Sequence, residues 1–250
     1  KSWARYDETG FYSDIGVING RKTILLFDVA RFKLTVLSRQ RRIDEFKAWV
    51  HRHNEWLREF KKDAAREAIQ KDVDHEIEKM KLELRRIKEA LSLKIPYLGI
   101  CLGLQTLVKA AGGKVAKSPV KEVGFKGPDA KPFIISLTED GKKDEFFNEL
   151  GDNFRVFQLH GETVEFTQDM KLLGTGKFCQ NQIVKIGANA YGIQCHFELT
   201  PEMFELWLNE DADLLRLNKK QLQNEFNAFL DEYTSTGRKL FQNFLKIAGF

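Results

Sequence analysis

The sequence Ile95-Pro-Tyr-Leu-Gly-Ile-Cys-Leu-Gly-Leu-Gln105 joins a short apolar run to a cysteine that stands between two glycines. An apolar run that follows a proline is typical of a strand buried on both faces. The segment Leu104 to Ala111 has the pattern of an amphipathic helix, and Gly112-Gly113 is a helix stop. A strand, a tight turn that carries a nucleophile, and a helix together form a nucleophile elbow. We therefore predict that Cys101 is a nucleophile at a helix N-terminus, where the thiolate is favoured.

The alternative for Cys101 is a buried structural cysteine at a strand end, and a second motif bears on this choice. The segment Tyr191-Gly-Ile-Gln-Cys-His-Phe-Glu198 places His196 and Glu198 two residues apart. In an extended segment, residues two apart point to the same side, so both can face one site while Cys195 points to the core. A histidine can take the thiol proton, and a carboxylate can hold the imidazole in the useful tautomer.

The two motifs together resemble those of class I, triad-type glutamine amidotransferases. The family's nucleophile motif is Gly-Ile-Cys-x-Gly-x-Gln, and its second motif is usually His-Pro-Glu. The resemblance covers roughly Ile77 to Phe250. It is strongest to stand-alone domains similar to the amidotransferase half of GMP synthase. It implies an α/β, flavodoxin-like fold and hydrolysis of the glutamine side-chain amide through a Cys101 thioester, with His196 and Glu198 completing the triad.

The resemblance also implies binding roles for other residues. The Leu102 N–H would donate to the oxyanion, and Gln105 would bind the amino-acid end of glutamine. The loop at His160 and Gly161 would line the glutamine pocket. The released ammonia would pass to an acceptor, such as a synthase partner, that the sequence does not identify. No metal or organic cofactor is expected, because Cys and His are scattered along the chain.

The chain departs from the family pattern in two places. Phe197 stands where the family has proline, and no Gly-Gly-Pro-type loop precedes Ile95. That loop supplies half of the family's oxyanion hole. The departures predict a very weak glutaminase and an incomplete sheet. They also support the alternative function, a catalytically impaired or inactive interaction protein with the amidotransferase fold.

The N-terminal residues 1–72 are predicted to be an atypical extension of an amidotransferase-like domain at residues 73–250. Asn19-Gly20 between two apolar runs predicts a β-hairpin of Ile15–Ile18 and Thr23–Phe27. The hairpin, a long helix or a second copy of the chain is expected to cover the edge of the Ile95–Ile100 strand, because a bare apolar edge invites association.

A long helix, or two helices that meet near residues 70–72, is predicted from about Ile43 to Leu93, because this stretch contains neither glycine nor proline. An apolar stripe along its second half is expected to pack on the sheet, and a coiled-coil seam is the alternative. The stripe consists of Val73, Ile77, Met80, Leu84, Ile87 and Leu91.

Charge is unevenly distributed along the 250 residues. Residues 1–94 carry 22 Lys and Arg against 16 Asp and Glu, whereas the remainder carries 18 against 20. The basic surplus is interpreted as a solvated helical face, with dimerisation or nucleic-acid contact as alternatives. Nucleic acid is disfavoured, because no base-stacking or zinc motif accompanies the charge.

The sequence also bears on the compartment. No apolar run is long enough for a membrane helix, and nothing at the N-terminus has the pattern of a signal peptide. Three cysteines together with a candidate thiolate nucleophile favour a reducing, cytoplasmic location.

The remainder of the chain predicts further strands and helices. Strands are expected at Lys114–Val120, Pro132–Leu137 and Arg155–His160, a hairpin at Asn181–Ile186 and Tyr191–Cys195, and helices at Asp144–Leu150, Glu202–Asn209, Lys219–Thr234 and Gly237–Ile247.

Overall fold

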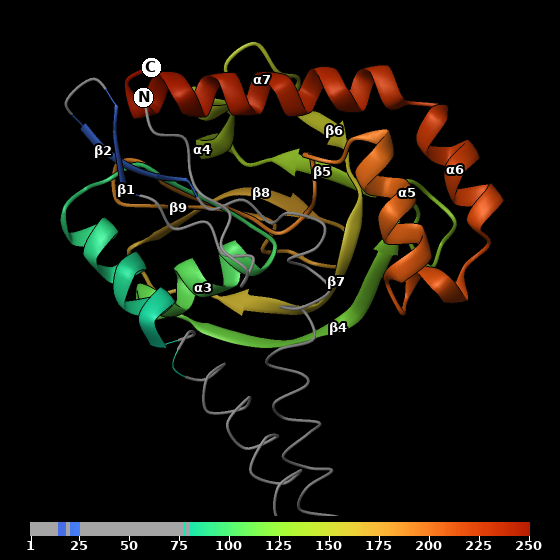
Figure 1. The fold of residues 1–250 in the computed structure, drawn as a ribbon, viewed down its shortest axis with the longest axis horizontal. Helices are drawn as coiled ribbons and strands as arrows, with labels where there is room; N and C mark the ends of the chain where they lie inside the picture. Colours follow the sequence, from blue (N-terminus) through green and yellow to red (C-terminus); the bar gives the residue numbers. More distant parts are fainter. Residues whose placement is uncertain (1–14, 19–20, 26–77, 79–80) are drawn as a thin grey trace, which may run out of the picture.

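The computed structural model describes residues 15–18, 21–25, 78 and 81–250 (Figure 1). A helix over residues 81–92 precedes the nucleophile strand. The strands are β1 (Ile15–Ile18), β2 (Arg21–Leu25), β3 (Tyr97–Ile100), β4 (Lys114–Gly124), β5 (Ile134–Leu137), β6 (Asn153–Arg155), β7 (Gln158–Glu165), β8 (Met170–Gly176), β9 (Ile183–Ile186) and β10 (Ala190–Ile193). The further helices are α3 (Leu102–Ala110), α4 (Glu139–Lys142), η1 (Glu145–Phe147), α5 (Pro201–Glu210), η2 (Leu214–Arg216), α6 (Lys219–Asn227) and α7 (Leu230–Ala248).

Eight strands form one curled, mixed sheet in the order β1-β2-β3-β10-β9-β8-β5-β6. The central strands β2, β3 and β10 are parallel, and the other pairs are antiparallel. The long strands β4 and β7 form a separate antiparallel pair. β3 therefore runs between two parallel neighbours, β2 and β10, and the carboxyl ends of parallel strands commonly form sites.

The nucleophile strand β3 is buried along its whole length, as its apolar sequence predicts. Leu98 and Ile100 belong to a core that includes Leu240 and Phe244 of α7. Tyr97 belongs to a core on the opposite face, formed with α3 and the 81–92 helix. In Figure 1, α7 accordingly runs along one side of the sheet, while α3 and the 81–92 helix lie at the other.

The apolar stripe before β3 packs on the sheet where the structure describes it. Ile87 is buried, and Leu84 and Leu91 pack partly buried against the same core as Tyr97. The earlier stripe residues and the predicted long helix lie outside the described residues.

The N-terminal hairpin is confirmed. β1 and β2 pair antiparallel, with Ile18 opposite Arg21, and the two residues between them lie outside the described structure. β2 pairs with β3 through Ile24 and Leu25, and it therefore covers part of the strand edge, as expected. The incomplete sheet was expected to leave this side of β3 without its usual parallel neighbours, and the parallel pairing of β2 differs from that expectation. A hairpin pattern carries no information on its outer neighbours.

Several predicted boundaries in the C-terminal part are wrong. β8 and α4 were not predicted, and β4 continues to Gly124. The predicted helix break at Gly237 does not occur, since α7 runs through this residue and the break lies between α6 and α7. A Cβ at position 237 would lie 2.2 Å from the carbonyl oxygen of Phe197. The glycine therefore permits a close helix contact and does not end the helix.

A second core of aromatic side chains holds α5 and α6 against the β4–β7 pair. Phe125 contacts the rings of Phe157, Phe204 and Phe226 at centroid distances of 4.9, 5.4 and 5.5 Å. Trp207 belongs to the same core. No helix among the described residues is both long and apolar enough to cross a membrane.

Candidate active site

Cys101 follows β3 directly and caps the N-terminus of α3. Its backbone has φ 54° and ψ −102°, a strained conformation for a residue with a side chain. A Cβ on Gly99 would lie 2.4 Å from the backbone of Gly103. Gly99 is therefore required by the tight strand-to-helix turn, as expected for a nucleophile elbow, whereas a Cβ on Gly103 would meet only the Tyr97 hydroxyl at 4.0 Å.

The parallel pairing of β3 with β10 brings the two sequence motifs together. Ile100 lies opposite Ile193, and the Cys101 N–H donates to the Ile193 carbonyl oxygen at 2.6 Å. The residues that follow β10 therefore lie beside Cys101. Gln194 illustrates this proximity, because its Nε2 lies 3.6 Å from the Cys101 sulfur.

His196 and Glu198 lie in contact after β10. The imidazole Nδ1 is 2.5 Å from Glu198 Oε1, so a proton on Nδ1 points to the carboxylate and Nε2 is left to act as a base. The His196 N–H donates to the Phe157 carbonyl oxygen at 2.8 Å. The ring lies edge-to-face against Trp207 at 5.1 Å. The imidazole is thus fully buried and held in one orientation.

Phe197, the residue in place of the family's proline, has a definite role in this geometry. Its backbone N–H donates to Glu198 Oε2 at 2.9 Å. Proline has no N–H and could not make this bond. Phenylalanine in place of proline therefore adds a hydrogen bond to the Glu198 carboxylate that contacts His196. The Phe197 side chain is buried in the same core as residues of α7.

The predicted substrate contacts Leu102 and Gln105 both lie on the first turns of α3. Leu102 is the first helical residue, a position at which the N–H has no acceptor within the helix. Gln105 is buried, and its Nε2 donates to Gln194 Oε1 at 3.3 Å. Gln194 therefore bridges Cys101 and Gln105. The sequence reasoning missed Gln194, although its spacing of two from His196 places both on one side of an extended segment.

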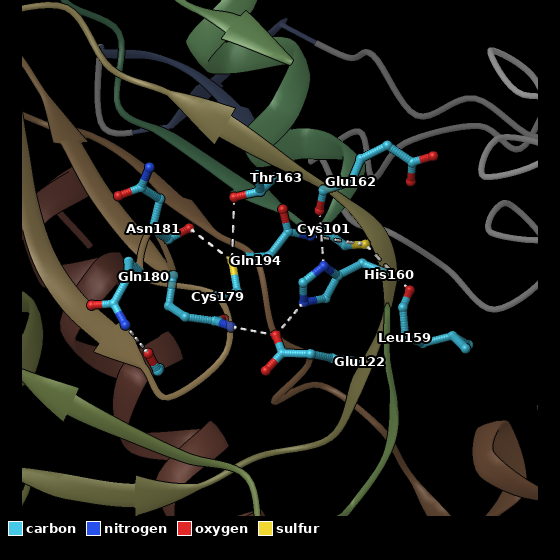
Figure 2. A network of polar contacts seen from close by, with 12 residues as sticks. Cys101, Glu122, Leu159, His160, Glu162, Thr163, Cys179, Gln180, Asn181 and Gln194 are labelled. Atoms are coloured by element: carbon cyan, nitrogen blue, oxygen red, sulfur yellow. Dashed lines mark hydrogen bonds and ion pairs between the residues drawn. The ribbon is translucent and has the colours of Figure 1, made fainter. Parts of the chain in front are cut away.

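His160 and Gly161 lie within strand β7, so the loop predicted at this point is wrong. The Cα of His160 pairs with that of Glu122 on β4, which explains why the strand continues. The side chain is buried and faces Glu122, with Nε2 2.8 Å from Oε2 (Figure 2). Its neighbour Leu159 presents a carbonyl oxygen 3.9 Å from the Cys101 sulfur. The backbone at this point therefore borders the candidate nucleophile.

The three cysteines of the chain are all buried and unbridged. Burial, assisted by the charges of Glu198 and Glu122, raises the pKa of the Cys195 thiol well above its usual value. Burial likewise raises the pKa of Cys179, which contacts Thr163 at 3.3 Å. Both thiols are therefore kept protonated at neutral pH. Cys195 belongs to the main core, as expected from its alternation with His196.

Donor atoms suited to a metal ion come together at one point of the described structure. The side chains of Glu122, His160 and Cys179 offer an oxygen, a nitrogen and a sulfur, all within 4.8 Å of one another. The expectation that Cys and His are too scattered for a metal site therefore fails for this group. These residues are remote in sequence, and only the pairing of β4 with β7 brings two of them together.

The chain matches the family described as glutamine amidotransferase class-I over residues 72–211, which is more than half of its length. The chain belongs to this family. The amidotransferase match starts at residue 72, where the predicted N-terminal extension ends. That residues 1–72 form a separate extension stays a prediction.

Individual relatives of this amidotransferase agree with the family match. The chain is 29% identical over 168 residues to the glutamine amidotransferase-like protein YfeJ of Salmonella typhimurium, covering 61% of this chain and 67% of the relative. It is 36% identical over 117 residues to the glutamine-hydrolysing GMP synthase of Borreliella burgdorferi, covering 46% of this chain. The match spans only 21% of that synthase.

A solved glutamine amidotransferase from Thermotoga maritima has the same fold. It aligns with a TM-score of 0.58 and 27% identity over 68% of this chain and 70% of its own length. This structural similarity, together with the mixed sheet and the helices on its faces, confirms the predicted flavodoxin-like amidotransferase fold.

Proposed function

We propose that this amidotransferase hydrolyses the side-chain amide of glutamine, with Cys101 as the nucleophile. The carrying observation is the parallel pairing of β3 with β10, which sets the Cys101 elbow beside the segment that holds the His196–Glu198 contact. A cysteine on a strained turn at a helix N-terminus, next to a histidine oriented by a carboxylate, has the arrangement of a thiol hydrolase.

The reaction follows from these groups. His196 takes the Cys101 proton, and the thiolate attacks the amide carbon of glutamine. The tetrahedral intermediate collapses when the imidazolium returns the proton to the leaving nitrogen, which departs as ammonia. Water, deprotonated by His196, then attacks the thioester and releases glutamate and the thiol. Glu198 holds the Nδ1–H tautomer of His196 throughout.

The Leu102 N–H is proposed as one donor to the oxyanion, because it follows the nucleophile into α3. Loss of one of two donors costs roughly 100- to 1,000-fold in rate. A second donor is not expected from the sequence before Ile95, and residues 26–77 lie outside the described structure. We therefore expect slow glutamine hydrolysis by the chain alone.

The ammonia is proposed to pass to a synthase partner. The supporting observation is the match to a glutamine-hydrolysing GMP synthase, which covers 21% of that enzyme. The name of that enzyme combines glutamine hydrolysis with a synthase reaction.

The alternative, an interaction protein with an impaired site, is favoured by one observation. The Cys101 side chain is fully buried, and the Gln194 amide lies against its sulfur. For glutamine to reach the Cys101 sulfur, the Gln194 side chain would have to move. If it did not move, the protein would be inactive and would act only by binding a partner.

Ammonia release from glutamine by the purified chain tests the proposal. Wild-type protein is expected to release ammonia slowly from glutamine but not from asparagine, and Cys101→Ala to release none. Trapping of a glutamyl adduct on Cys101 by mass spectrometry would identify the intermediate. If wild type and Cys101→Ala release ammonia at the same rate and no adduct forms, the interaction-protein alternative holds.

A further inference from the structure

Three side chains with metal-ligand chemistry meet in a buried cluster that the glutaminase mechanism does not use. Glu122 comes from β4, His160 from β7 and Cys179 from the turn between β8 and β9. Their exposed fractions are 1%, 1% and 2%. All three ligand atoms lie within 4.8 Å of one another. We propose that Glu122, His160 and Cys179 bind a zinc ion.

The donor set and its charge fit zinc. Zn²⁺ is borderline-soft and accepts carboxylate oxygen, imidazole nitrogen and thiolate sulfur, commonly with three protein ligands and one water. A carboxylate and a thiolate together carry two negative charges, which a divalent cation neutralises. Buried charges are otherwise costly unless they are paired. The mixture of sulfur with a carboxylate and an imidazole disfavours magnesium and calcium, which prefer oxygen ligands.

The surroundings of His160 already have the form found around metal-binding histidines. Its Nδ1 lies 2.8 Å from the carbonyl oxygen of Glu162, so that Nδ1 carries the proton and donates (Figure 2). The Nε2 lone pair of the neutral ring then points to the cluster. A hydrogen bond from one ring nitrogen to a carbonyl is the usual means of fixing a histidine ligand. In the structure Nε2 faces Glu122 at 2.8 Å, and this contact would open to admit the ion.

The other two ligands are also held by neighbouring polar groups. Gln182 donates from Nε2 to Glu122 Oε2 at 3.0 Å. Cys179 contacts the Thr163 hydroxyl at 3.3 Å. Asn181, in the same turn, donates to the Val164 carbonyl oxygen at 2.6 Å and ties the turn to β7. The ligands thus have the outer contacts that orient side chains in metal sites.

Two unpartnered acceptors provide an independent indication of a missing group. The side-chain oxygens of Gln158 and Gln182 are buried and have no hydrogen-bond partner within the described part of the chain. Gln182 contacts the cluster directly through Glu122. A buried acceptor without a donor is costly. Because a zinc-bound water donates hydrogen bonds, a water in the fourth position would offer a donor beside Gln182, the one of the two that contacts a ligand.

A cavity adjoins the cluster on the side of Glu122. A cavity of about 740 Å³ is lined by Glu122 and Gln158 together with residues of β5, β6 and β8. Gly176 and Gln180, which flank the Cys179 turn, also line it. Glu122 is the one of the three proposed ligands that lines this cavity. The proposal therefore has the ion enter on the Glu122 side of the cluster.

A zinc ion here would add a further link between the β4–β7 pair and the β8–β9 turn, which already share side-chain hydrogen bonds. Glu122 and His160 belong to the β4–β7 pair, whereas Cys179 belongs to the β8–β9 turn of the main sheet. The connection would lie next to Leu159, whose carbonyl oxygen faces the Cys101 sulfur. The expected effects are a more stable chain and a fixed position for the backbone beside the nucleophile.

Metal titration of the purified full-length chain tests the proposal without reference to activity. After removal of metals with a chelator, wild type is expected to bind one Zn²⁺. Co²⁺ in its place should give a thiolate charge-transfer absorption. Cys179→Ser should lose this absorption and bind Zn²⁺ at least about 100-fold more weakly, since even outer contacts cost 10- to 100-fold. Glu122→Gln, which keeps the side-chain shape, should weaken binding similarly.

Cys195→Ser is the matched control, because Cys195 is equally buried but lies outside the cluster. It should bind Zn²⁺ like wild type and keep the Co²⁺ absorption. Wild type that binds no Zn²⁺ at micromolar concentration would overturn the proposal, whatever the variants do. So would an absorption that survives Cys179→Ser and disappears in Cys101→Ala, because the metal would then sit on the nucleophile.

Discussion

The two neighbours of β3 differ in how much of the strand they cover. β10 pairs with β3 along its whole length, from Tyr97 to Ile100, whereas β2 pairs only with Tyr97 and Leu98. The end of β3 that leads into Cys101 is therefore held by β10 alone among the described strands. The β10 side leads into the segment that holds His196 and Glu198, whereas the residues that follow Leu25 on the β2 side lie outside the described structure.

The largest expected effect falls on the chemical groups after β10. His196→Ala should lower glutamine turnover by at least about 1,000-fold, and Glu198→Gln by about 100-fold, because orientation contributes less than proton transfer. Ammonia release measures both. Labelling of Cys101 by a diazo-ketone analogue of glutamine provides a second readout if turnover is slow, and it should slow in His196→Ala. Turnover that survives His196→Ala unchanged would refute the role of this side of β3.

Proline substitutions compare the two neighbours of β3 directly. Gly192→Pro places a residue without an N–H between β3 and β9 and should destabilise the chain by roughly 3 kcal/mol or prevent folding. Ile24→Pro in β2 should cost about 1 kcal/mol and leave turnover intact. It should also promote concentration-dependent association through the freed edge. Urea unfolding and size-exclusion chromatography measure these effects, and equal destabilisation by both substitutions would contradict the comparison.

Gly237→Ala tests the contact of α7 with the segment after β10. The added Cβ would lie 2.2 Å from the Phe197 carbonyl oxygen, so α7 or that segment must move. We expect a loss of about 1–3 kcal/mol in unfolding free energy and a lower turnover. Gly151→Ala is the control, since its nearest atom would be 3.8 Å away, and it should leave both quantities unchanged. A neutral Gly237→Ala would show that the contact is easily relaxed.

The smallest expected effect concerns cysteine labelling. Cys101 should react with the diazo-ketone roughly tenfold faster than Cys179 or Cys195. In metal-free protein the raised pKa values of the latter two thiols keep them protonated, so their labelling should stay slow as the pH rises from 7 to 8. Mass spectrometry after brief exposure decides, and equal labelling of all three cysteines in folded protein would contradict the elbow assignment.

The central strand, the elbow and the hairpin could be predicted because each has a local signal. A buried run followed by Gly-Ile-Cys-Leu-Gly predicts the elbow, and Asn19-Gly20 predicts the antiparallel pairing of the strands on either side of it. The pairing of β2 with β3 could not be predicted, since the partner strands are separated by more than seventy residues and neither sequence specifies the other.

In the candidate site, too, residues with a local sequence signal could be predicted and residues without one could not. Cys101, His196 and Glu198 were recognised from two short motifs, and the family match agrees with those motifs. Gln194 and Glu122 were not recognised, because each matters through a contact with a residue distant in sequence: Gln194 with Cys101, 93 positions away, and Glu122 with His160, 38 positions away. Gly237 was misread, since a glycine that permits close packing has the same sequence signal as one that ends a helix.

The backbone of Cys101 has a consequence for attempts to engineer this protein. At φ 54° and ψ −102° a side chain costs about 1–3 kcal/mol, whereas glycine tolerates positive φ. Cys101→Gly should therefore raise the melting temperature while it removes the sulfur. A library screened only for heat resistance would accumulate glycine at this position and lose the nucleophile. Screening for thermostability in this fold therefore needs a parallel assay for the thiol.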